Sequence, residues 1–490
     1  MDWFKQLDVS IAIQVLIFFL VVNTIGALIT VFRRPRSIAS VFAWMMALIF
    51  LPGLGFFLYA FVGRKIDGEV IYLLNSHHQR RISEINQMIE EHNQKFSDGE
   101  IASSSRLLKD YFDYAEESPL TRGNQLEIIT DGKQKFSELF ADINQAKETI
   151  HIEYYAIFDD RIGNQLLNLL IQKAKEGVKV RVLFDPFGGR TTVKFFKPLI
   201  AVGGKVLPFI TARDFIRKTR LNYHLHRKIV VIDGKISWTG GFNVGDQYLN
   251  ETKRFGYWRD THARMIGTVS FSLQEVFIRD WNASVIKPED YLEYDEKYFC
   301  LPEESEYGDV QLQVVADGPD ADDQILKGGF IKMILSAKKR VWIQSPYLIP
   351  DDSMLDALNI AVRSGVDVRI MIPNMPDHPF IYRATQYYAN FLHKKGVKIY
   401  IYKGGFLHAK TLVVDHELAS FGTTNQDIRS YALNFEVNTF AYSRAVTDEL
   451  ASIFKADMLE STVLTTEMIA KQSKWLRTKQ AFSRLLSPIL

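Results

Sequence analysis

The chain is almost without cysteine. Its 490 residues, enough for two or three domains, include only Cys300, which excludes an intrachain disulfide and a cysteine-ligated metal. It also lacks an excess of either charge, with 59 Lys and Arg against 57 Asp and Glu, so nothing in its charge indicates nucleic acid binding or disorder. Outside one repeated motif, its histidines lack the spacing of metal ligands. We therefore expect no metal site, no cofactor and no nucleic acid partner.

Charge is missing altogether from two runs near the start. Residues 9–32 and 37–63 contain no charged side chain, and each exceeds the roughly 20 residues that cross a bilayer core. A removable signal peptide is the alternative for the first run, but its apolar part would be shorter and would follow a positive start. We therefore predict a transmembrane hairpin over residues 1–65. We therefore expect a multi-pass protein of the cell membrane. The arrangement of its basic residues favours a main domain in the cytoplasm.

The second run contains Pro52-Gly53, which would kink the helix or make this segment re-entrant. After it, a polar helical connector is expected over 66–125. A tail at 458–490 is basic and amphipathic, and it has two interpretations of equal weight. It either lies on anionic lipid headgroups or packs as a helix on the body.

From residue 126 onward, strand-like apolar runs alternate with helical patterns, which is typical of an α/β layer fold. The same order is written twice. We expect one domain over 126–286, a linker over 287–309 and a second domain over 310–457. The first domain has a strand at 150–155, a helix at 162–176 and a strand at 178–184; the second has the corresponding elements at 341–344, 354–364 and 366–372.

One short motif also occurs twice. His-x-Lys-x4-Asp, followed by Gly and Asn at the same spacings, begins at His226 and again at His408. Chance explains two such copies poorly. Each is predicted to form a strand on which His and Lys share one face, followed by a turn and a returning strand that brings the Asn back beside the His. The copies supply His226, Lys228, Asp233 and Asn243, and His408, Lys410, Asp415 and Asn425.

These residue types suit phosphate chemistry. An imidazole can act as nucleophile or as acid and base, and an ammonium and a carboxamide can bind phosphate oxygens. Asp233 and Asp415 lie an odd number of residues after the histidines, so along a strand they would point to the opposite face. We therefore expect them to hold the hairpin turns rather than to touch substrate.

The doubled motif resembles that of the phospholipase D superfamily, over both halves of the chain. The resemblance implies two duplicated α/β/α sandwich domains packed about a pseudo-twofold axis. It also implies metal-independent transfer through a phosphohistidine, with His226 as nucleophile and His408 as acid and base. A downstream carboxylate would orient each histidine, namely Asp260 in the first half and Glu436 in the second. The phosphate-binding positions are Lys228, Asn243, Lys410 and Asn425, and the catalytic motif includes Asp233 and Asp415.

The two copies differ after the motif's glycine, where Gly241 stands in the first and Thr423 in the second. We expect a hydrogen bond to phosphate to be missing in the first half. This pairing, with Asn434-Phe435-Glu436 and the apolar start, is similar to bacterial cardiolipin synthases. That resemblance implies a phosphatidyltransferase that joins two phosphatidylglycerol molecules in the bilayer into cardiolipin and releases glycerol.

Three alternatives remain at this stage. Water as acceptor would make the protein a membrane-bound phospholipase D that yields phosphatidic acid, and the motifs do not separate hydrolysis from transfer. A nuclease or other phosphodiesterase of the superfamily would need a basic groove with stacking aromatic residues, which the balanced charge disfavours. An inactive lipid-binding scaffold would be expected to have lost one of the motifs, and both are intact.

Overall fold

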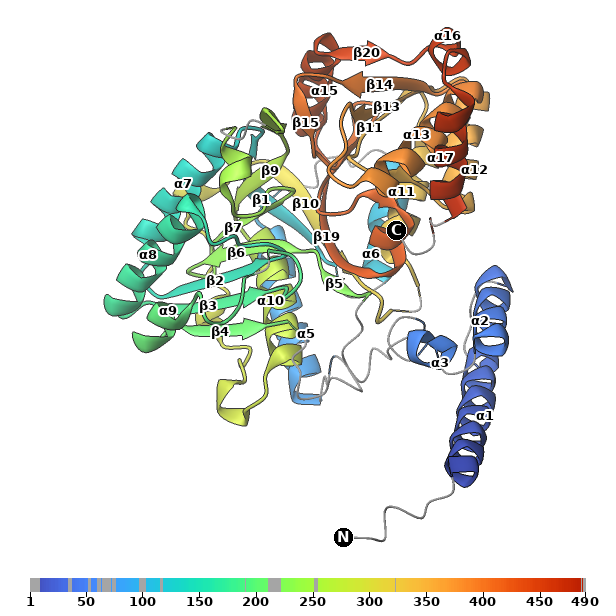
Figure 1. The fold of residues 1–490 in the computed structure, drawn as a ribbon. Helices are drawn as coiled ribbons and strands as arrows, with labels where there is room; N and C mark the ends of the chain where they lie inside the picture. The colour runs from blue at the N-terminus through green and yellow to red at the C-terminus, as the bar shows by residue number, and fades with distance from the viewer. Residues whose placement is uncertain are drawn as a thin grey trace, which may run out of the picture. The chain divides into compact units, whose positions relative to one another are not determined.

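The computed structural model describes most of the chain in two units (Figure 1). One unit comprises Met1–Asp67 and Asp214–Tyr223, and the other comprises Gly68–Arg213 and His224–Leu490. The described residues are 9–33, 38–51, 54–59, 63, 72, 76–96, 103–114, 118–189, 191–209, 222–250, 254–321, 323–485 and 487.

The first unit consists of helices α1 (Val9–Arg33), α2 (Ile38–Phe50) and α3 (Leu54–Leu58). Its small core contains Ala27, Val31, Leu48 and Tyr59, while many other apolar side chains of these helices are exposed. Within the described residues, no helix is both long enough and apolar enough to cross a membrane. The hairpin predicted at 9–32 and 37–63 therefore stays a prediction, and the Pro52-Gly53 step lies outside the described residues.

The second unit is built on one continuous mixed sheet. Its two central strands, β1 (Leu120–Ile129) and β10 (Val310–Asp317), pair in antiparallel fashion and join the two halves. Outward from β1 the order is β9 (His262–Ile266), β7 (Ile236–Gly240), β6 (Lys228–Ile232), β2 (Thr149–Tyr154), β3 (Lys179–Phe184) and β4 (Lys205–Pro208). Outward from β10 it is β19 (Asn434–Ala441), β17 (Leu418–Gly422), β16 (Thr411–Val414), β11 (Arg340–Gln344), β13 (Asp367–Pro373), β14 (Lys398–Tyr402) and β20 (Ser461–Val463).

Helices cover both faces of this sheet because its strands are apolar on both sides. On one face each half has its own core, formed with α7 (Gly132–Gln145), α8 (Arg161–Lys175) and α9 (Lys197–Ala201), or with α11 (Ile325–Ser336), α12 (Asp352–Arg363) and α13 (Pro379–Lys394). On the other face, α10 (Val269–Ser284) and α15 (Arg444–Leu459) contribute to a single core that both halves share.

Segments outside the repeats also pack on this body. Asn93, at the end of α5 (Ser76–Asn93), hydrogen-bonds the backbone around β1, and α6 (Ser103–Tyr114) inserts Phe112 into the core of the second half. The join between the halves contains the short 3-10 helices η5 (Pro288–Asp290), η6 (Glu296–Tyr298) and η7 (Glu304–Glu306). The remaining elements are β5 (His224–Leu225), η4 (Asp246–Leu249), β8 (Tyr257–Arg259), β12 (Leu348–Ile349), β15 (Gly405–Leu407), β18 (Gln426–Asp427), α14 (Ile428–Ala432), α16 (Thr466–Ala470) and α17 (Lys474–Leu485).

The predicted α/β repeat is confirmed, and its elements fall within one or two residues of their expected places. The strand predicted at 150–155 is β2, and the helix predicted at 162–176 is α8. In the second half, the helix predicted at 354–364 is α12. Gly177 and Gly365, which follow these two helices, have φ angles of 98° and 83°, a conformation that glycine adopts without strain.

Candidate active site

Two short strand pairs between the halves place the histidines. Strand β5 runs parallel to the start of β19, and the amide of the next residue, His226, donates to the carbonyl of Phe435 at 2.9 Å. In the same way β15 runs parallel to β8, and the amide of His408 donates to the carbonyl of Arg259 at 2.7 Å. Each histidine is therefore fixed by a strand of the opposite half.

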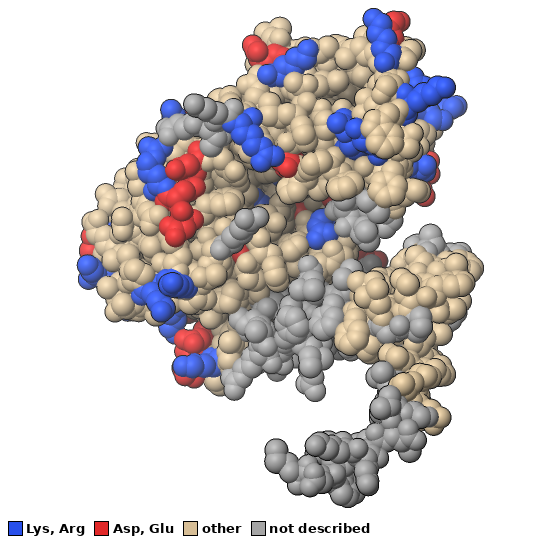
Figure 2. Space-filling view, viewed as in Figure 1, with Lys and Arg blue, Asp and Glu red and all other residues tan. Residues whose placement is uncertain are grey.

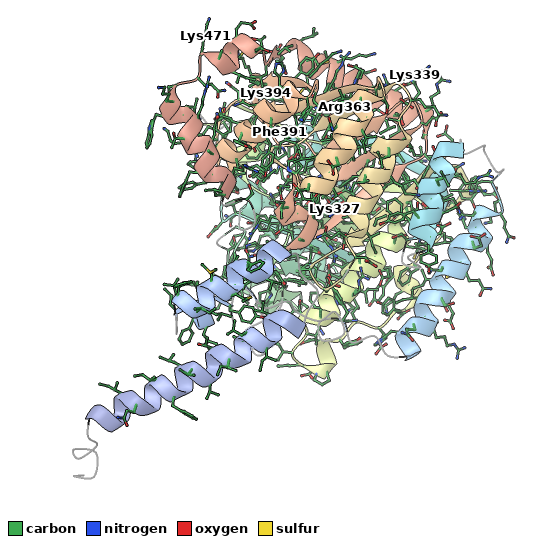
Figure 3. The ribbon with its side chains drawn as sticks, turned by 90° about the vertical axis from the view of Figure 1, so that its right-hand side faces the viewer. Lys327, Lys339, Arg363, Phe391, Lys394 and Lys471 are labelled. Carbon is green, nitrogen blue, oxygen red and sulfur yellow. The ribbon has the colours of Figure 1, made fainter. Side chains whose placement is uncertain are left out.

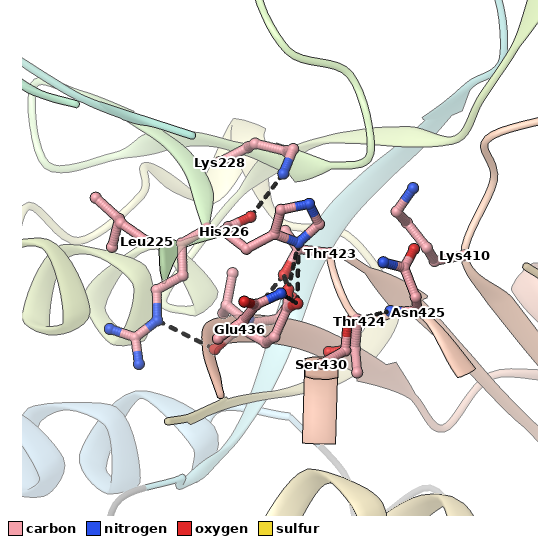
Figure 4. Close-up of polar contacts among 12 residues, drawn as sticks. Leu225, His226, Lys228, Lys410, Thr423, Thr424, Asn425, Ser430 and Glu436 are labelled. Carbon is pink, nitrogen blue, oxygen red and sulfur yellow. Dashed lines mark hydrogen bonds and ion pairs between the residues drawn. The ribbon is translucent and has the colours of Figure 1, made fainter. Parts of the chain in front are cut away.

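The orienting carboxylates cross between the halves. Nδ1 of His226 lies 2.9 Å from both carboxylate oxygens of Glu436 (Figure 4), and Nδ1 of His408 lies 2.6 Å from Oδ2 of Asp260. The sequence prediction, which paired each histidine with the carboxylate downstream in its own half, is corrected here. The physical reason is the strand pairing, since β19 carries Glu436 to His226 and β8 leads to Asp260 beside His408. A carboxylate on Nδ1 leaves Nε2 of each ring for chemistry.

The difference between Gly241 and Thr423 concerns these carboxylates. The Thr423 hydroxyl donates to Oε2 of Glu436 at 2.5 Å, whereas a Cβ atom on Gly241 would lie 1.9 Å from Oδ1 of Asp260. One copy therefore needs a hydroxyl to hold its carboxylate, and the other needs empty space to admit it. The expectation that Gly241 costs the site a phosphate hydrogen bond is replaced by this explanation.

Two buried lysines complete the centre. Nζ of Lys228 donates to the carbonyl of His226, and Nζ of Lys410 donates to the carbonyl of His408, each at 2.6 Å. Burial lowers the pKa of Lys228 to about 7 and that of Lys410 to about 8, and each ammonium also lowers the pKa of the histidines. The lysines of both halves thus act on one site, and a bound anion would stabilise their charged forms.

The two asparagines differ in their present partners. Asn243 accepts from the amide of Ala156 at 3.2 Å and donates to the hydroxyl of Tyr248 at 3.1 Å, so its side chain is already engaged. Within the described residues, the side-chain oxygen of Asn425 is buried and has no hydrogen-bond partner. Asn425 is therefore the more available of the two for a ligand.

The histidines are neutral in the free protein, while their partners are charged. Burial lowers the pKa of His226 to about 4 and also lowers that of His408. Burial alone would raise the pKa values of Asp260 and Glu436, but the hydrogen bond from the facing histidine and the charge of the nearby lysine outweigh it and lower both. A neutral imidazole can attack phosphorus, and the carboxylate behind it stabilises the cation that results.

Asp233 and Asp415 lie away from this centre, and including them among the catalytic residues was wrong. Both have positive φ angles, 51° and 50°, in the turns at the far ends of β6 and β16. The carboxylate of Asp233 accepts from the amides of residues 147, 148 and 149, and that of Asp415 accepts from those of 338, 339 and 340. These hydrogen bonds hold each hairpin turn against the start of the neighbouring strand, which is the role expected from the sequence.

Two buried arginines, which the sequence did not single out, support the orienting residues. Nε of Arg227 donates to the backbone carbonyl of Glu436 at 3.1 Å, and its Nη1 forms an ion pair with Asp280 of α10. Nη1 of Arg259 donates to the backbone carbonyl of Asp260, and its Nη2 lies 2.9 Å from Asp457 of α15.

The two supports are alike in geometry but not in sequence. In each, an aspartate on a helix pairs with an arginine, and the arginine donates to the backbone of the carboxylate residue that contacts a motif histidine. Arg227 follows a histidine, whereas Arg259 precedes a carboxylate, and both belong to the first half. The repeat pattern therefore could not reveal them.

A buried glutamate adds to the difference between the halves. Gln344, the last residue of β11, donates to Asp457 at 2.7 Å. At the corresponding place in β2 stands Glu153, which is fully buried beside Asp280. Burial and then the charge of Asp280 raise the pKa of Glu153 well above its ordinary value. Glu153 is therefore a neutral acid that can donate to Asp280 as the amide of Gln344 does to Asp457.

Known protein families match the chain separately in its two halves and near its start. The family described as "Cardiolipin synthase, PLD-like domain" matches residues 139–265 and 330–458, and "Phospholipase_D-nuclease N-terminal" matches 22–64. A cardiolipin synthase of Listeria welshimeri is 45% identical over 481 residues, covering 97% of this chain and 98% of the relative. The major cardiolipin synthase ClsA of Bacillus subtilis is 43% identical over 488 residues, covering 98% and 100%.

Among solved structures, a phosphatidylserine synthase from Haemophilus influenzae superposes with a TM-score of 0.60 at 13% identity. The match covers 78% of this chain and all of that one. At this identity the likeness concerns the fold alone.

Proposed function

Because the chain belongs to the bacterial cardiolipin synthases of the phospholipase D superfamily, we propose that it transfers the phosphatidyl group of one phosphatidylglycerol to a headgroup hydroxyl of another. The products are cardiolipin and glycerol. The observation that carries the chemistry is the pair of crossed histidine–carboxylate contacts beside two buried lysines.

In the first step, Nε2 of neutral His226 attacks the phosphorus of the donor lipid. A P–N bond forms while the P–O bond to glycerol breaks, and His408 gives its proton to the departing oxygen. We propose that Lys228, Lys410 and Asn425 bind the phosphate oxygens and that the Glu436 carboxylate stabilises the cationic ring of His226. The anionic phosphate would also raise the pKa of His408, so that His408 is protonated when the donor is bound.

In the second step, His408 takes the proton of the acceptor hydroxyl, whose oxygen then attacks the phosphorus. The P–N bond breaks, a P–O bond to the second lipid forms, and His226 becomes neutral again. One phosphodiester replaces another, so the exchange needs no nucleotide to drive it. If water takes the place of the acceptor, the product is phosphatidic acid.

The N-terminal unit is proposed to hold the enzyme in the cell membrane as a multi-pass anchor, with the catalytic unit in the cytoplasm. The uncharged runs at 9–32 and 37–63, the exposed apolar side chains of α1 and the family match at 22–64 support this. Retention of the chain in membranes after alkaline carbonate extraction, and its release when residues 1–65 are deleted, would agree with the proposal. Release of the intact chain would contradict it.

Product analysis tests the reaction. Purified protein supplied with phosphatidylglycerol in the presence of a chelator should form cardiolipin and glycerol in equal amounts. Phosphatidic acid as the main product would replace the synthase proposal by hydrolysis. Substitution of His226 or His408 by alanine should abolish both products while the thermal unfolding midpoint stays near that of the parent. Appreciable turnover by either variant would refute the two-histidine mechanism.

A further inference from the structure

Helix α17, near the end of the chain, places its side chains in an unusual way. Its polar residues Gln480 and Ser483 are buried at 2% and 1% exposure, whereas Trp475, Phe482 and Leu485 are 67%, 55% and 74% exposed. A helix on a globular body ordinarily buries its apolar side chains and exposes its polar ones. These three apolar side chains of α17 are therefore turned largely toward solvent instead of toward the body that supports the helix.

The inward contacts of α17 are polar and fix this orientation. Asn390 of α13 donates to the side-chain oxygen of Gln480 at 3.3 Å and to that of Gln472 at 3.0 Å. The guanidinium of Arg484 lies 5.1 Å from the ring centroid of Tyr387, also in α13. Helix α17 cannot turn its apolar residues inward without losing these contacts.

Basic residues surround the apolar face. From residue 470 to the end the chain has no Asp or Glu, and α17 contributes Lys474, Lys479 and Arg484. Nζ of Lys479 lies 5.4 Å from the ring centroid of Trp475. Within the described part of the chain, none of these three basic side chains has an ion-pair partner. Long basic side chains beside exposed aromatic rings are typical of residues that reach lipid headgroups while the rings enter the interface.

The neighbouring helix extends this surface. Phe391 and Lys394 of α13 are exposed, and Figure 3 shows them on one side of the second half together with Lys471. In Figure 2, basic side chains gather along the right-hand edge of the second half, where α13 and α17 lie in Figure 1. We call the exposed residues Phe391, Lys394, Lys471, Lys474, Trp475, Lys479, Phe482 and Leu485 the α17 face.

We infer that the α17 face is a docking surface for an anionic lipid bilayer. Its apolar side chains enter the boundary between headgroups and acyl chains, and its unpaired cations contact lipid phosphates. Charge complementarity favours a bilayer over a second copy of the chain, because in a face-to-face dimer the cations of α17 would meet one another. The inference concerns membrane contact by the catalytic unit and does not depend on the chemistry at the histidines.

A spin label on the full chain tests this contact. Cys300 is replaced by serine, and a single cysteine is introduced by Phe482→Cys or, as a matched control, by Asn168→Cys on the exposed side of α8. Each protein is reconstituted in bilayers of phosphatidylglycerol or of phosphatidylcholine. Oxygen, which concentrates in the bilayer, and a water-soluble nickel complex then compete to relax the label.

We expect the ratio of oxygen to nickel accessibility at position 482 to be several-fold that at position 168 in phosphatidylglycerol. The ratio should approach the control value in phosphatidylcholine, and also in about 1 M salt, where the Debye length is about 3 Å. Equal ratios at the two positions in phosphatidylglycerol would overturn the inference. So would a label shielded from both reagents, which indicates a protein partner, or equal results in both lipids.

A charge variant provides a second measurement. Replacing Lys471, Lys474 and Lys479 by serine should bring the ratio at position 482 down to the control value in phosphatidylglycerol. Turnover of phosphatidylglycerol dispersed in detergent should stay unchanged, because none of the three contacts the histidine site. An unchanged ratio would overturn the electrostatic part of the inference. Since the label needs no turnover, a wrong substrate assignment would leave this result intact.

Discussion

The arginine behind Glu436 allows stability and activity to be separated. Arg227 and its partner Asp280 are both buried, at 1% and 0% side-chain exposure. Replacing Arg227 by methionine leaves the Asp280 charge without its cation, which costs about 3–5 kcal/mol of folding free energy for a buried pair. Replacing Asp280 by asparagine as well removes that charge, so the double variant should regain most of the lost stability.

Activity should not return in the double variant. The carbonyl of Glu436 still lacks its donor from Arg227, and a hydrogen bond from a charged group contributes roughly 1.5–3 kcal/mol. If that energy holds Glu436 against His226 in the transition state, kcat falls about 10- to 150-fold at roughly 1.4 kcal/mol per tenfold change. Urea unfolding in detergent measures the stability, and initial rates of cardiolipin formation measure kcat.

A half-buried ion pair elsewhere serves as the control. Arg264 contacts both carboxylate oxygens of Asp142 at 2.8 Å and touches none of the site residues. Arg264→Met should lower stability while the folded fraction keeps its kcat. Recovery of full kcat by the double variant at Arg227 and Asp280 would refute the positioning role and leave Arg227 as a counter-ion only. An Arg227→Met variant that keeps the stability and the kcat of the parent would refute both the counter-ion role and the positioning role of Arg227.

Three further predictions concern the lysines and the carboxylates. Because kcat/KM reports the free enzyme, in which His408 must gain a proton to act as the acid, it should fall about tenfold per pH unit above the lowered pKa of His408. Since the ammonium forms of the lysines are proposed to bind the phosphate, the fall should steepen above about pH 7, where Lys228 loses its proton, and again above about pH 8, where Lys410 does; a flat profile of initial rates up to pH 9 would contradict this. Gly241→Ala should lower kcat by about 100-fold or more, since its Cβ would occupy the place of the Asp260 carboxylate. Thr423→Val should lower kcat about tenfold while Thr423→Ser retains it, and equal rates for the two would show that the hydroxyl is dispensable.

Local pattern was enough to predict much of the fold. The alternation of residues along β6 and β16, and the glycines that end α8 and α12, depend on neighbours in sequence. The duplication then fixed which segments correspond. The motif lysines and histidines could be chosen for the same reason, since residues two apart on a strand share a face.

The partners of those residues could not be predicted in the same way. Glu436 reaches His226 only because β5 pairs with β19, a contact between segments about half the chain apart. Arg259 and Arg227 occupy different places in their repeats, so comparing the halves does not reveal their shared role. Glu153 reads as an ordinary acidic residue until its burial beside Asp280 shows that it is a neutral donor.

The same contacts explain how two copies of one motif can take different roles. The carboxylate of Glu436 accepts from Thr423 and from Asn434 besides facing His226, so its negative charge is shared among several donors. A carboxylate shared in this way stabilises a proton on its histidine less, and burial separately lowers the pKa of His226 to about 4. Asp260 accepts from the amide of Thr261 through one oxygen and keeps the other for His408 at 2.6 Å. Its charge is thus directed more fully at His408, and this favours His226 as the neutral nucleophile and His408 as the residue that carries the proton.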